Sequence, residues 1–431
     1  MPSVHPFPAL NRPALFAITS AAALSLFSAG CHRKQQNTET VSAPPPKPKP
    51  TMSEIDLKSY HPNEAGAVMI LMYHRIRASE ADNDLNRKPE TFRKDLEELY
   101  KRGYRPVNAG EFAENKMDVP IGKTPVVLTF DDSLPTQFNI IRGTDGQPHI
   151  DPNCAIGIME TFHKEHPDWN TKATFFVLPE YQGGGKTSPP PFYDPATVTD
   201  KIEYLLKNGY EVANHTTTHP QMNRLSPDKI QWEIGNAAHS IQQLSPKLKL
   251  DVLALPYGRL PHKDHRKYLE SGTGGGESYK NKAVFLAAYR PVASPVTYVD
   301  KKTAVYQIAP FDPYKIERVL PDVRQAEKPG TFEYWLKWFD ENPTQRYVSD
   351  GNPNLVAYPK SLAKMVDVAA IKKQGKEPYP YSFGSSSGGG SLSVESGGGS
   401  SHGGGLSVEG SPSSGSKPNG GNLGVESSPR R

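Results

Sequence analysis

One apolar run, Pro125-Val126-Val127-Leu128-Thr129-Phe130, ends in two adjacent carboxylates, Asp131 and Asp132. The run has no polar alternation, which predicts a strand that is buried on both faces. Buried strands of this kind are typical of parallel α/β folds, where active sites gather at the carboxyl ends of the strands. We therefore expect Asp131 and Asp132 at such an edge, although an Asp-Asp pair after a strand is more often only a turn or a helix cap.

Short strand-like runs alternate with helical spacing on both sides of this strand. Strands are expected at residues 67–74, 104–107, 125–130, 174–178, 209–214 and 250–255. Helices are expected at residues 92–103, 155–166, 198–208 and 226–244, the last with Ser226 as its N-cap. The glycine-rich stretches at 183–185 and 271–277 are interpreted as loops. The alternation predicts a parallel α/β architecture, and by itself it does not exclude an open doubly wound sheet.

A second group of metal-ligating residues, His215 and His219, follows the expected strand 209–214. A His-x-x-x-His spacing is common by chance, but this strand would deliver His215 in the same way that the first delivers its carboxylates. One carboxylate and two imidazoles can bind a divalent metal, and the other carboxylate is then left to act as a base on a bound water. The residues therefore predict a metal-assisted hydrolase.

Three motifs in this order resemble those of a known family. They are Thr129-Phe130-Asp131-Asp132, then Asn214-His215-Thr216-Thr217-Thr218-His219, then Leu255-Pro256-Tyr257-Gly258. They are similar to the successive motifs of NodB-type polysaccharide deacetylases, carbohydrate esterase family four, over about residues 67 to 319, with continuation to about residue 373. Tyr73-His74 resembles the start of the poly-N-acetylglucosamine deacetylase branch. The resemblance implies a distorted, incomplete (β/α) barrel.

The resemblance also implies a role for each motif residue. Asp131 is the expected general base, and Tyr257 is expected to stabilise the oxyanion through its backbone N–H. The expected metal ligands are Asp132, His215 and His219. Zinc is the expected metal, and Co or Ni would fit the same ligands. His74 is expected to line the cleft as a further catalytic residue, and the alternative is a strand-end histidine that hydrogen-bonds a carbonyl.

Two departures from the family pattern affect the expected mechanism. The family often has an arginine shortly before the Pro-Tyr-Gly turn, where this chain has Leu253-Ala254-Leu255, so Asp131 must be oriented in another way. Many members use a late histidine as the general acid, and no histidine occurs between residues 265 and 402. His74, His262 and His265 are the possible substitutes.

The leading hypothesis is an exported enzyme that removes acetyl groups from the N-acetylated sugars of a polysaccharide. An O-acetyl esterase acting on xylan-like chains would use the same site. A catalytically weak carbohydrate-binding protein of the same fold is the alternative from another class. Asp131 argues against a pure binder, because a binder does not need an uncompensated second carboxylate.

Both ends of the chain differ in composition from its centre. Residues 1–31 have the layout of a secretory signal peptide, and Ser28-Ala29-Gly30-Cys31 resembles a bacterial lipobox, which predicts a lipid anchor on Cys31 and an exported, membrane-attached or periplasmic protein. Residues 32–62, which include the Pro-rich stretch 42–50, are expected to form a linker. Residues 63–374 are expected to form the catalytic domain, and the Gly/Ser-rich residues 382–431 a disordered tail.

Composition excludes several other classes. The formal net charge is only +4 and the basic residues are scattered, so nothing favours a nucleic-acid partner. No apolar run after residue 30 is long enough to span a bilayer. The two cysteines, Cys31 and Cys154, leave no intrachain disulfide if Cys31 carries lipid, and Cys154 is expected to be a packed residue and not a nucleophile.

Overall fold

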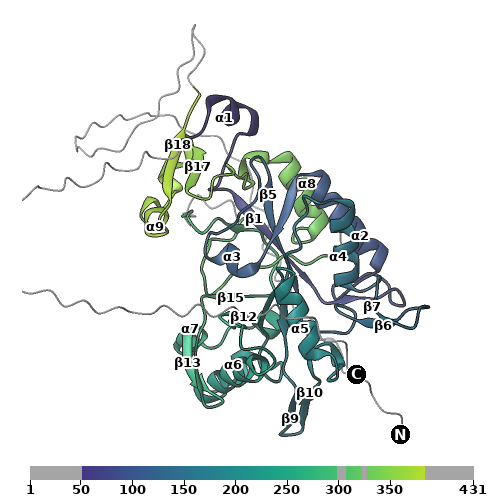
Figure 1. Ribbon diagram of the computed structural model, residues 1–431. Helices are drawn as coiled ribbons and strands as arrows, with labels where there is room; N and C mark the ends of the chain where they lie inside the picture. The colour runs from purple at the N-terminus through teal and green to yellow at the C-terminus, as the bar shows by residue number, and fades with distance from the viewer. Residues whose placement is uncertain (1–50, 299–306, 323–327, 384–431) are drawn as a thin grey trace, which may run out of the picture. The chain divides into compact units, whose positions relative to one another are not determined.

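The structure is a computed structural model that describes residues 51–298, 307–322 and 328–383 (Figure 1). The expected signal peptide with Cys31, the Pro-rich stretch 42–50 and the tail from residue 384 lie outside the described residues. No helix among the described residues is long and apolar enough to cross a membrane. The helices are α1 (Glu54–Tyr60), α2 (Pro89–Lys101), α3 (Ala109–Ala113), α4 (Ala155–Glu165), α5 (Val198–Lys207), α6 (Pro227–Gln242), α7 (Lys267–Glu270), α8 (Phe332–Glu341) and α9 (Val368–Lys373).

Within the described ranges, eight strands form one sheet that is mostly parallel. Its order is β15 (Ala283–Phe285), β12 (Val252–Ala254), β11 (Glu211–Asn214), β8 (Thr174–Val177), β5 (Thr124–Phe130), β1 (Ala67–Tyr73) and β16 (Val292–Ala293), with β4 (Tyr104–Val107) also paired to β5. Only β16 is antiparallel to its neighbour. β5 and β11 both pair with β8 in parallel, so their carboxyl ends point to the same edge of the sheet.

The sheet is curled, and the irregular segment 316–319 forms hydrogen bonds with both β15 and β1. The Ile316 amide donates to Val284 on the β15 side at 2.9 Å, and the Val319 amide donates to Ile70 of β1 at 2.7 Å. Each side receives only one bridge, to Phe285 and to Leu71, so the closing segment is not a full strand. The expectation of a parallel α/β fold with a distorted, incomplete barrel is therefore confirmed.

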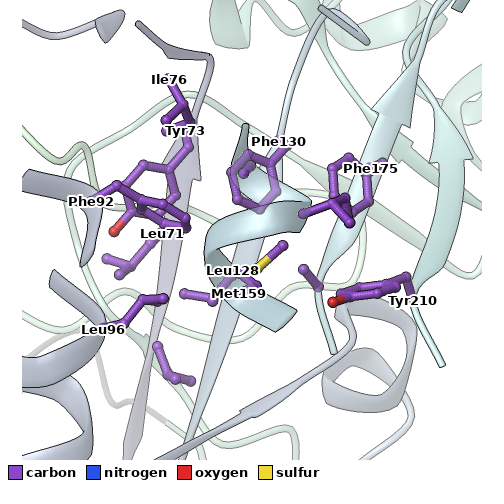
Figure 2. Close-up of a cluster of buried hydrophobic side chains, with 14 of the residues drawn as sticks. Leu71, Tyr73, Ile76, Phe92, Leu96, Leu128, Phe130, Met159, Phe175 and Tyr210 are labelled. Carbon is purple, nitrogen blue, oxygen red and sulfur yellow. The ribbon is translucent and has the colours of Figure 1, made fainter. Parts of the chain in front are cut away.

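Residues of the central strands alternate between two apolar layers, as side chains on a pleated strand must. In β1, Val68 and Ile70 belong to a cluster contributed mainly by the strands themselves, the interior of the curled sheet. Met69, Leu71 and Tyr73 belong to the layer that packs under α2 and α4. Figure 2 shows this outer layer, where Phe92 and Leu96 of α2 and Met159 of α4 lie against Leu71, Leu128 and Phe130. The complete burial of β5 agrees with its uninterrupted apolar sequence.

Several expected loops are hairpins in the structure. The stretch around 183–185 joins β9 (Tyr181–Gly183) to β10 (Lys186–Ser188), and the stretch 271–277 lies in β13 (Ser271–Gly274) and β14 (Glu277–Lys280). A third hairpin contains β6 (Ile140–Arg142) and β7 (Pro148–Ile150). Gly146, Gly184, Gly185, Gly275 and Gly276 occupy the turns, where positive φ angles are needed. Glycine content predicted the turns and missed the short strands beside them.

The ends of the expected catalytic region also differ from the sequence interpretation. Helix α1 lies inside the expected linker, because Leu57 is fully buried against β17 (Leu355–Pro359) and β18 (Glu377–Tyr381). These two strands pair in parallel as a separate small sheet, and β18 lies beyond the expected limit at residue 374. Ser226 does occupy the N-cap position of α6, but its side chain makes no capping hydrogen bond.

Candidate metal centre and active site

The three expected metal ligands meet in space. Asp132 Oδ1 lies 3.4 Å from His215 Nε2 and 3.3 Å from His219 Nε2. Among the described residues, this is the only group of three or more His, Cys, Asp or Glu side chains that could bind one ion. Their ligand atoms lie within 4.8 Å of one another. Asp132 Oδ1 is buried and accepts no hydrogen bond from the described residues, so it is an orphaned acceptor. A buried carboxylate oxygen beside two imidazole nitrogens fits a divalent cation.

Backbone contacts hold the first histidine in the orientation that a ligand needs. His215 Nδ1 lies 3.0 Å from the carbonyl oxygen of Ala254 at the end of β12. If Nδ1 carries the proton and donates it to this carbonyl, the lone pair of Nε2 is directed to Asp132 and is free to bind a metal. Two neighbouring strands therefore position this side chain together.

Glu233 on α6 organises the loop between the two histidines. Its carboxylate accepts hydrogen bonds from the amides of Thr217 and Thr218, at 3.0 and 2.8 Å. Asn214 accepts from the Thr216 amide at 2.8 Å and donates to the carbonyl of Ile234 on α6. Helix α6 therefore holds the loop that carries both histidines, and no sequence motif indicated that Glu233 takes part.

Backbone strain is concentrated at this site. Seven of the nine described non-glycine residues with positive φ lie in it or beside it: Asp132, Ser133, Phe192, Tyr193, Thr216, His219 and Tyr257. Each such residue costs of order 1–3 kcal/mol, which the surrounding structure must offset. Contacts such as the Phe192 amide to the Ser133 carbonyl, at 2.7 Å, hold these conformations in place. Two of the three candidate ligands are presented from strained backbone.

The second carboxylate, Asp131, is paired with a buried arginine. Arg318 donates two hydrogen bonds to it, both of 2.7 Å, and further ones to Thr129 and to the Leu286 carbonyl. Neither side chain of the pair is more than 4% exposed. Burial acts to raise the pKa of Asp131, but the charge and hydrogen bonds of Arg318, together with the charges of His215 and His74, hold this pKa below its usual value. Asp131 is therefore an ionised carboxylate in fixed orientation, next to the ligand cluster.

Arg318, like Glu233, is a site residue that the sequence interpretation missed. It lies in the segment that bridges β15 and β1, and so the closure of the sheet places its guanidinium over Phe176 inside the barrel. The sequence correctly indicated that Asp131 must be oriented by a group other than the arginine expected before Pro256. No periodicity around Arg318 could have identified it, because the segment belongs to no regular helix or strand.

His74 follows β1 directly and lies beside the carboxylates. Gln137 donates hydrogen bonds to the backbone carbonyls of both His74 and Asp131, which joins the ends of β1 and β5. His74 Nδ1 is buried and has no hydrogen-bond partner within the described ranges, so the alternative of a carbonyl-bonded structural histidine is not supported at that nitrogen. Burial lowers the pKa of His74 despite the nearby charges of Asp131 and Asp132, which favours the neutral imidazole.

A cavity of about 320 Å³ opens next to the ligand cluster. Asp132 and His74 lie in its wall, together with Arg75, Arg77 and Tyr193. This volume is at the lower end of the range of small-ligand sites, ~300–1,000 Å³. A ligand in the cavity would lie against the candidate metal centre.

Tyr257 packs against His219, and the centroids of the two rings are 4.8 Å apart. Its backbone has a φ of 58°, and no acceptor among the described residues receives a hydrogen bond from its amide. Its side chain is 57% exposed. The free amide agrees with the role expected for the backbone N–H of this residue, which the structure places beside the cluster.

The remaining candidates lie elsewhere. His262 and His265 contact each other at 5.8 Å between ring centroids, and His262 contacts exposed Asp264. In the described part of the chain, neither His262 nor His265 contacts the ligand cluster. Cys154 is buried at the N-cap of α4, where its sulfur accepts from the Gly157 amide, and burial raises the pKa of its thiol. It is a packed residue, as expected.

Comparison with known proteins agrees with this geometry. Residues 118–272 match the family described as polysaccharide deacetylase. The matched range contains Asp131, Asp132, His215, His219 and Tyr257, but neither His74 nor Arg318.

Similar proteins cover part of the chain. A chitooligosaccharide deacetylase of Bradyrhizobium sp. (strain ANU 289) is 26% identical over 32% of this chain and 48% of its own length. Another from Rhizobium leguminosarum bv. phaseoli is 29% identical over 32% of this chain and 46% of its own length. The chain thus spans about half the length of the curated relatives it matches. The Streptococcus pyogenes deacetylase PplD in complex with acetate aligns with a TM-score of 0.40 and 18% identity, over 59% of this chain and 93% of that chain. The motifs gathered at one edge of the sheet lie in the part of the chain, residues 118–272, that is similar to the polysaccharide deacetylase family.

Proposed function

We propose that this protein is a metal-dependent hydrolase that removes acetyl groups from the N-acetylated sugars of a polysaccharide. The observation that carries the proposal is the position of an ionised carboxylate, held by Arg318, beside the Asp132–His215–His219 cluster. The cluster supplies a metal site and Asp131 supplies a base, two of the groups that hydrolysis of an acetamide requires besides a proton donor to the leaving amine. The similarity to two chitooligosaccharide deacetylases supports this substrate class.

Asp132, His215 and His219 would hold one divalent cation, for which zinc is our assignment and Co or Ni the alternatives. When bound, such a cation supplies Lewis-acid polarisation of water and of the acetyl carbonyl. His215 is held by the Ala254 carbonyl, and Asp132 by the strained turn after β5. The chain therefore presents its ligands already oriented, at no ordering cost when the ion binds.

Asp131 accepts the proton of the attacking water in this proposal. Its depressed pKa keeps it ionised through the neutral range, and the two Arg318 hydrogen bonds leave it no freedom to rotate towards the metal. The Tyr257 amide donates to the carbonyl oxygen of the acetyl group as negative charge develops there. His74 faces the substrate from the cavity wall, and as a neutral imidazole it would orient a sugar hydroxyl or the amide.

Acetate release from a substrate panel tests the proposed reaction. The panel consists of chitin oligomers, β-1,6-linked glucosamine polymers, peptidoglycan and acetylated xylan, each incubated with the zinc-loaded protein. Release from any N-acetylated polymer supports the proposal. Release from acetylated xylan alone would instead identify an O-acetyl esterase, and release from none of the four would contradict both.

The Arg318→Gln variant should shift the acidic limb of the pH–rate profile to higher pH. In the wild type, the charge of Arg318 lowers the pKa of Asp131 against the effect of burial. Without this charge and its hydrogen bonds the effect of burial is opposed less strongly, so the pKa rises and the base becomes protonated at a higher pH than before. The measurement is kcat/KM against pH. Arg290→Gln, which removes the partly exposed pair between Arg290 and Glu317, is the matched control. An unchanged acidic limb in a folded Arg318 variant would show that Asp131 is not the titrating base.

We also propose that Cys31 carries a lipid that anchors the protein at a membrane surface. The support is the apolar run before Cys31 and the polar, Pro-rich stretch after it. We expect Cys31→Ser to move the protein from the membrane fraction to the soluble exported fraction, or to leave it unprocessed. Fractionation with an antibody against the protein measures this. Wild-type protein that is fully soluble after export would disprove the anchor and leave the catalytic proposal intact.

A further inference from the structure

The cavity beside the metal centre has a cationic wall that the reaction itself does not require. We propose that Arg75 and Arg77 form a subsite for the carboxylate of an acidic sugar that neighbours the N-acetylated sugar. This inference rests on the proposed function, because it takes the acetyl group to lie beside Asp132, one of the residues that line the cavity. It deepens the proposed function by assigning two residues that would select the sugar next to the acetylated one.

Strand geometry directs both arginines to the cavity. Arg75 and Ile76 form β2, which pairs with β3 (Asn86–Arg87), and the Arg77 amide extends this pairing by donating to the Arg87 carbonyl. Alternate residues of a strand point to opposite faces. Ile76 is buried in the outer apolar layer (Figure 2), so Arg75 and Arg77 share the other face and both line the cavity.

The two arginines have one ion-pair partner in common. Both face the same carboxylate, Glu80, at 2.9 Å from Arg75 and at 3.9 Å from Arg77. Arg75 Nε is buried without a hydrogen-bond partner in the described part of the chain, and the Arg77 side chain is 49% exposed. Nearby Asp82 is engaged elsewhere, since it accepts from the Lys88 amide and the Thr91 hydroxyl. The half-exposed Arg77, whose contact with Glu80 is long, thus retains guanidinium donors for a second carboxylate.

Among the residues that line the cavity, Asp132 is the only one with a carboxylate. Its Oδ1 is directed to His215 and His219, and it forms no ion pair with Arg75 or Arg77 within the described ranges. An arginine fork binds a carboxylate through two parallel charge-assisted hydrogen bonds, a geometry that a neutral sugar hydroxyl cannot reproduce. The cavity is therefore suited to an anionic group at some distance from the metal.

Tyr193 supplies an aromatic surface in the same cavity. It is 50% exposed, and both it and Phe192 adopt positive φ, held by the hydrogen bond from the Phe192 amide to Ser133. Strain of this kind persists where the surrounding structure fixes it, and it is concentrated at functional positions. An exposed tyrosine ring offers an apolar face to the ring of a sugar and a hydroxyl to its edge. Aromatic face and arginine wall together match a carboxylate-bearing sugar.

The carboxylate can come from two sources, the lactyl ether of a muramic acid or the ring carboxylate of a uronic acid. Binding separates these sources and does not depend on turnover. We would measure Kd by calorimetry with the purified, zinc-loaded Asp131→Asn protein and three oligosaccharides of equal length. One is an N-acetylglucosamine homopolymer, and in the other two N-acetylglucosamine alternates with N-acetylmuramic acid or with glucuronic acid.

We expect at least one acidic oligosaccharide to bind about tenfold or more tightly than the homopolymer, the usual effect of a charge-assisted hydrogen bond. Whichever acidic oligosaccharide binds more tightly identifies the source of the carboxylate. Arg77→Gln and the Arg75→Gln/Arg77→Gln double variant should reduce the preference to within about twofold, and Arg77→Glu, at a partly exposed position, should reverse it. Arg142→Gln is the control, because Arg142 lies in an exposed hairpin and bonds only to the Gly146 carbonyl there.

Three results would overturn the inference. They are equal binding of the homopolymer and both acidic oligosaccharides, an acidic preference that survives in folded Arg77→Glu protein, and no binding of either acidic oligosaccharide at millimolar concentration. Acetate release by the wild type is scored separately. A protein that binds acidic oligosaccharides through Arg77 but releases no acetate would disprove the proposed reaction and leave the subsite in place.

Discussion

Replacing Asp131 by asparagine should abolish turnover while the metal stays bound. Loss of a general base costs about 10²–10⁴-fold in rate, and asparagine cannot accept a proton at neutral pH. The metal should remain because Asp131 is outside the ligand cluster and its two oxygens are bound to Arg318. The measurements are kcat on the best acetylated substrate and metal content by elemental analysis of the same preparation.

The variant also leaves Arg318 buried opposite a neutral side chain, which can cost several kcal/mol of stability. Thermal unfolding of the variant must therefore show that it is folded at the assay temperature. Asp264→Asn, at a highly exposed position beside His262, is the matched control and should keep full activity. Activity of Asp131→Asn protein within a few-fold of the wild type would place the base on another residue.

Replacing His219 by alanine should remove most of the bound metal, and activity with it. The wild type should contain about one equivalent of divalent metal, because the described residues offer one cluster of three ligands. The variant keeps only Asp132 and His215, too few for a tetrahedral site that also leaves room for water. Metal per chain, measured after dialysis against metal-free buffer, is the readout, and it does not depend on any substrate.

His239→Ala is the matched control for this experiment. His239 lies on α6, is 40% exposed and contacts Glu277 in the β13–β14 hairpin, so its loss removes an imidazole without touching the cluster. It should retain the wild-type metal content. Stoichiometric metal in the His219 variant would disprove the ligand assignment, and loss of metal in both variants would indicate general instability.

The sequence predicted that the ligands follow the carboxyl ends of strands, because this placement depends on short local patterns. A run such as Val126–Phe130 can only be a buried strand, and in a parallel sheet all strands end at the same edge. Asp132 and His215 therefore meet even though β8 lies between their strands. The sequence did not predict the hairpins β9–β10 and β13–β14, because their strands have no such local pattern. Strands of three or four residues that are mostly exposed carry no apolar periodicity.

The amino-acid sequence by itself determined the parallel α/β architecture and the set of Asp131, Asp132, His215 and His219, since motif and strand are adjacent in the chain. Only the tertiary structure decided how Asp131 is held. Arg318 reaches it from a segment of irregular backbone, which the closure between β15 and β1 brings into the barrel. The structure likewise decided that Arg75 and Arg77 line a cavity with Asp132 and Tyr193. Local propensity specifies strands and their ends, whereas contacts between distant irregular segments arise only when the sheet curls and its two edges meet.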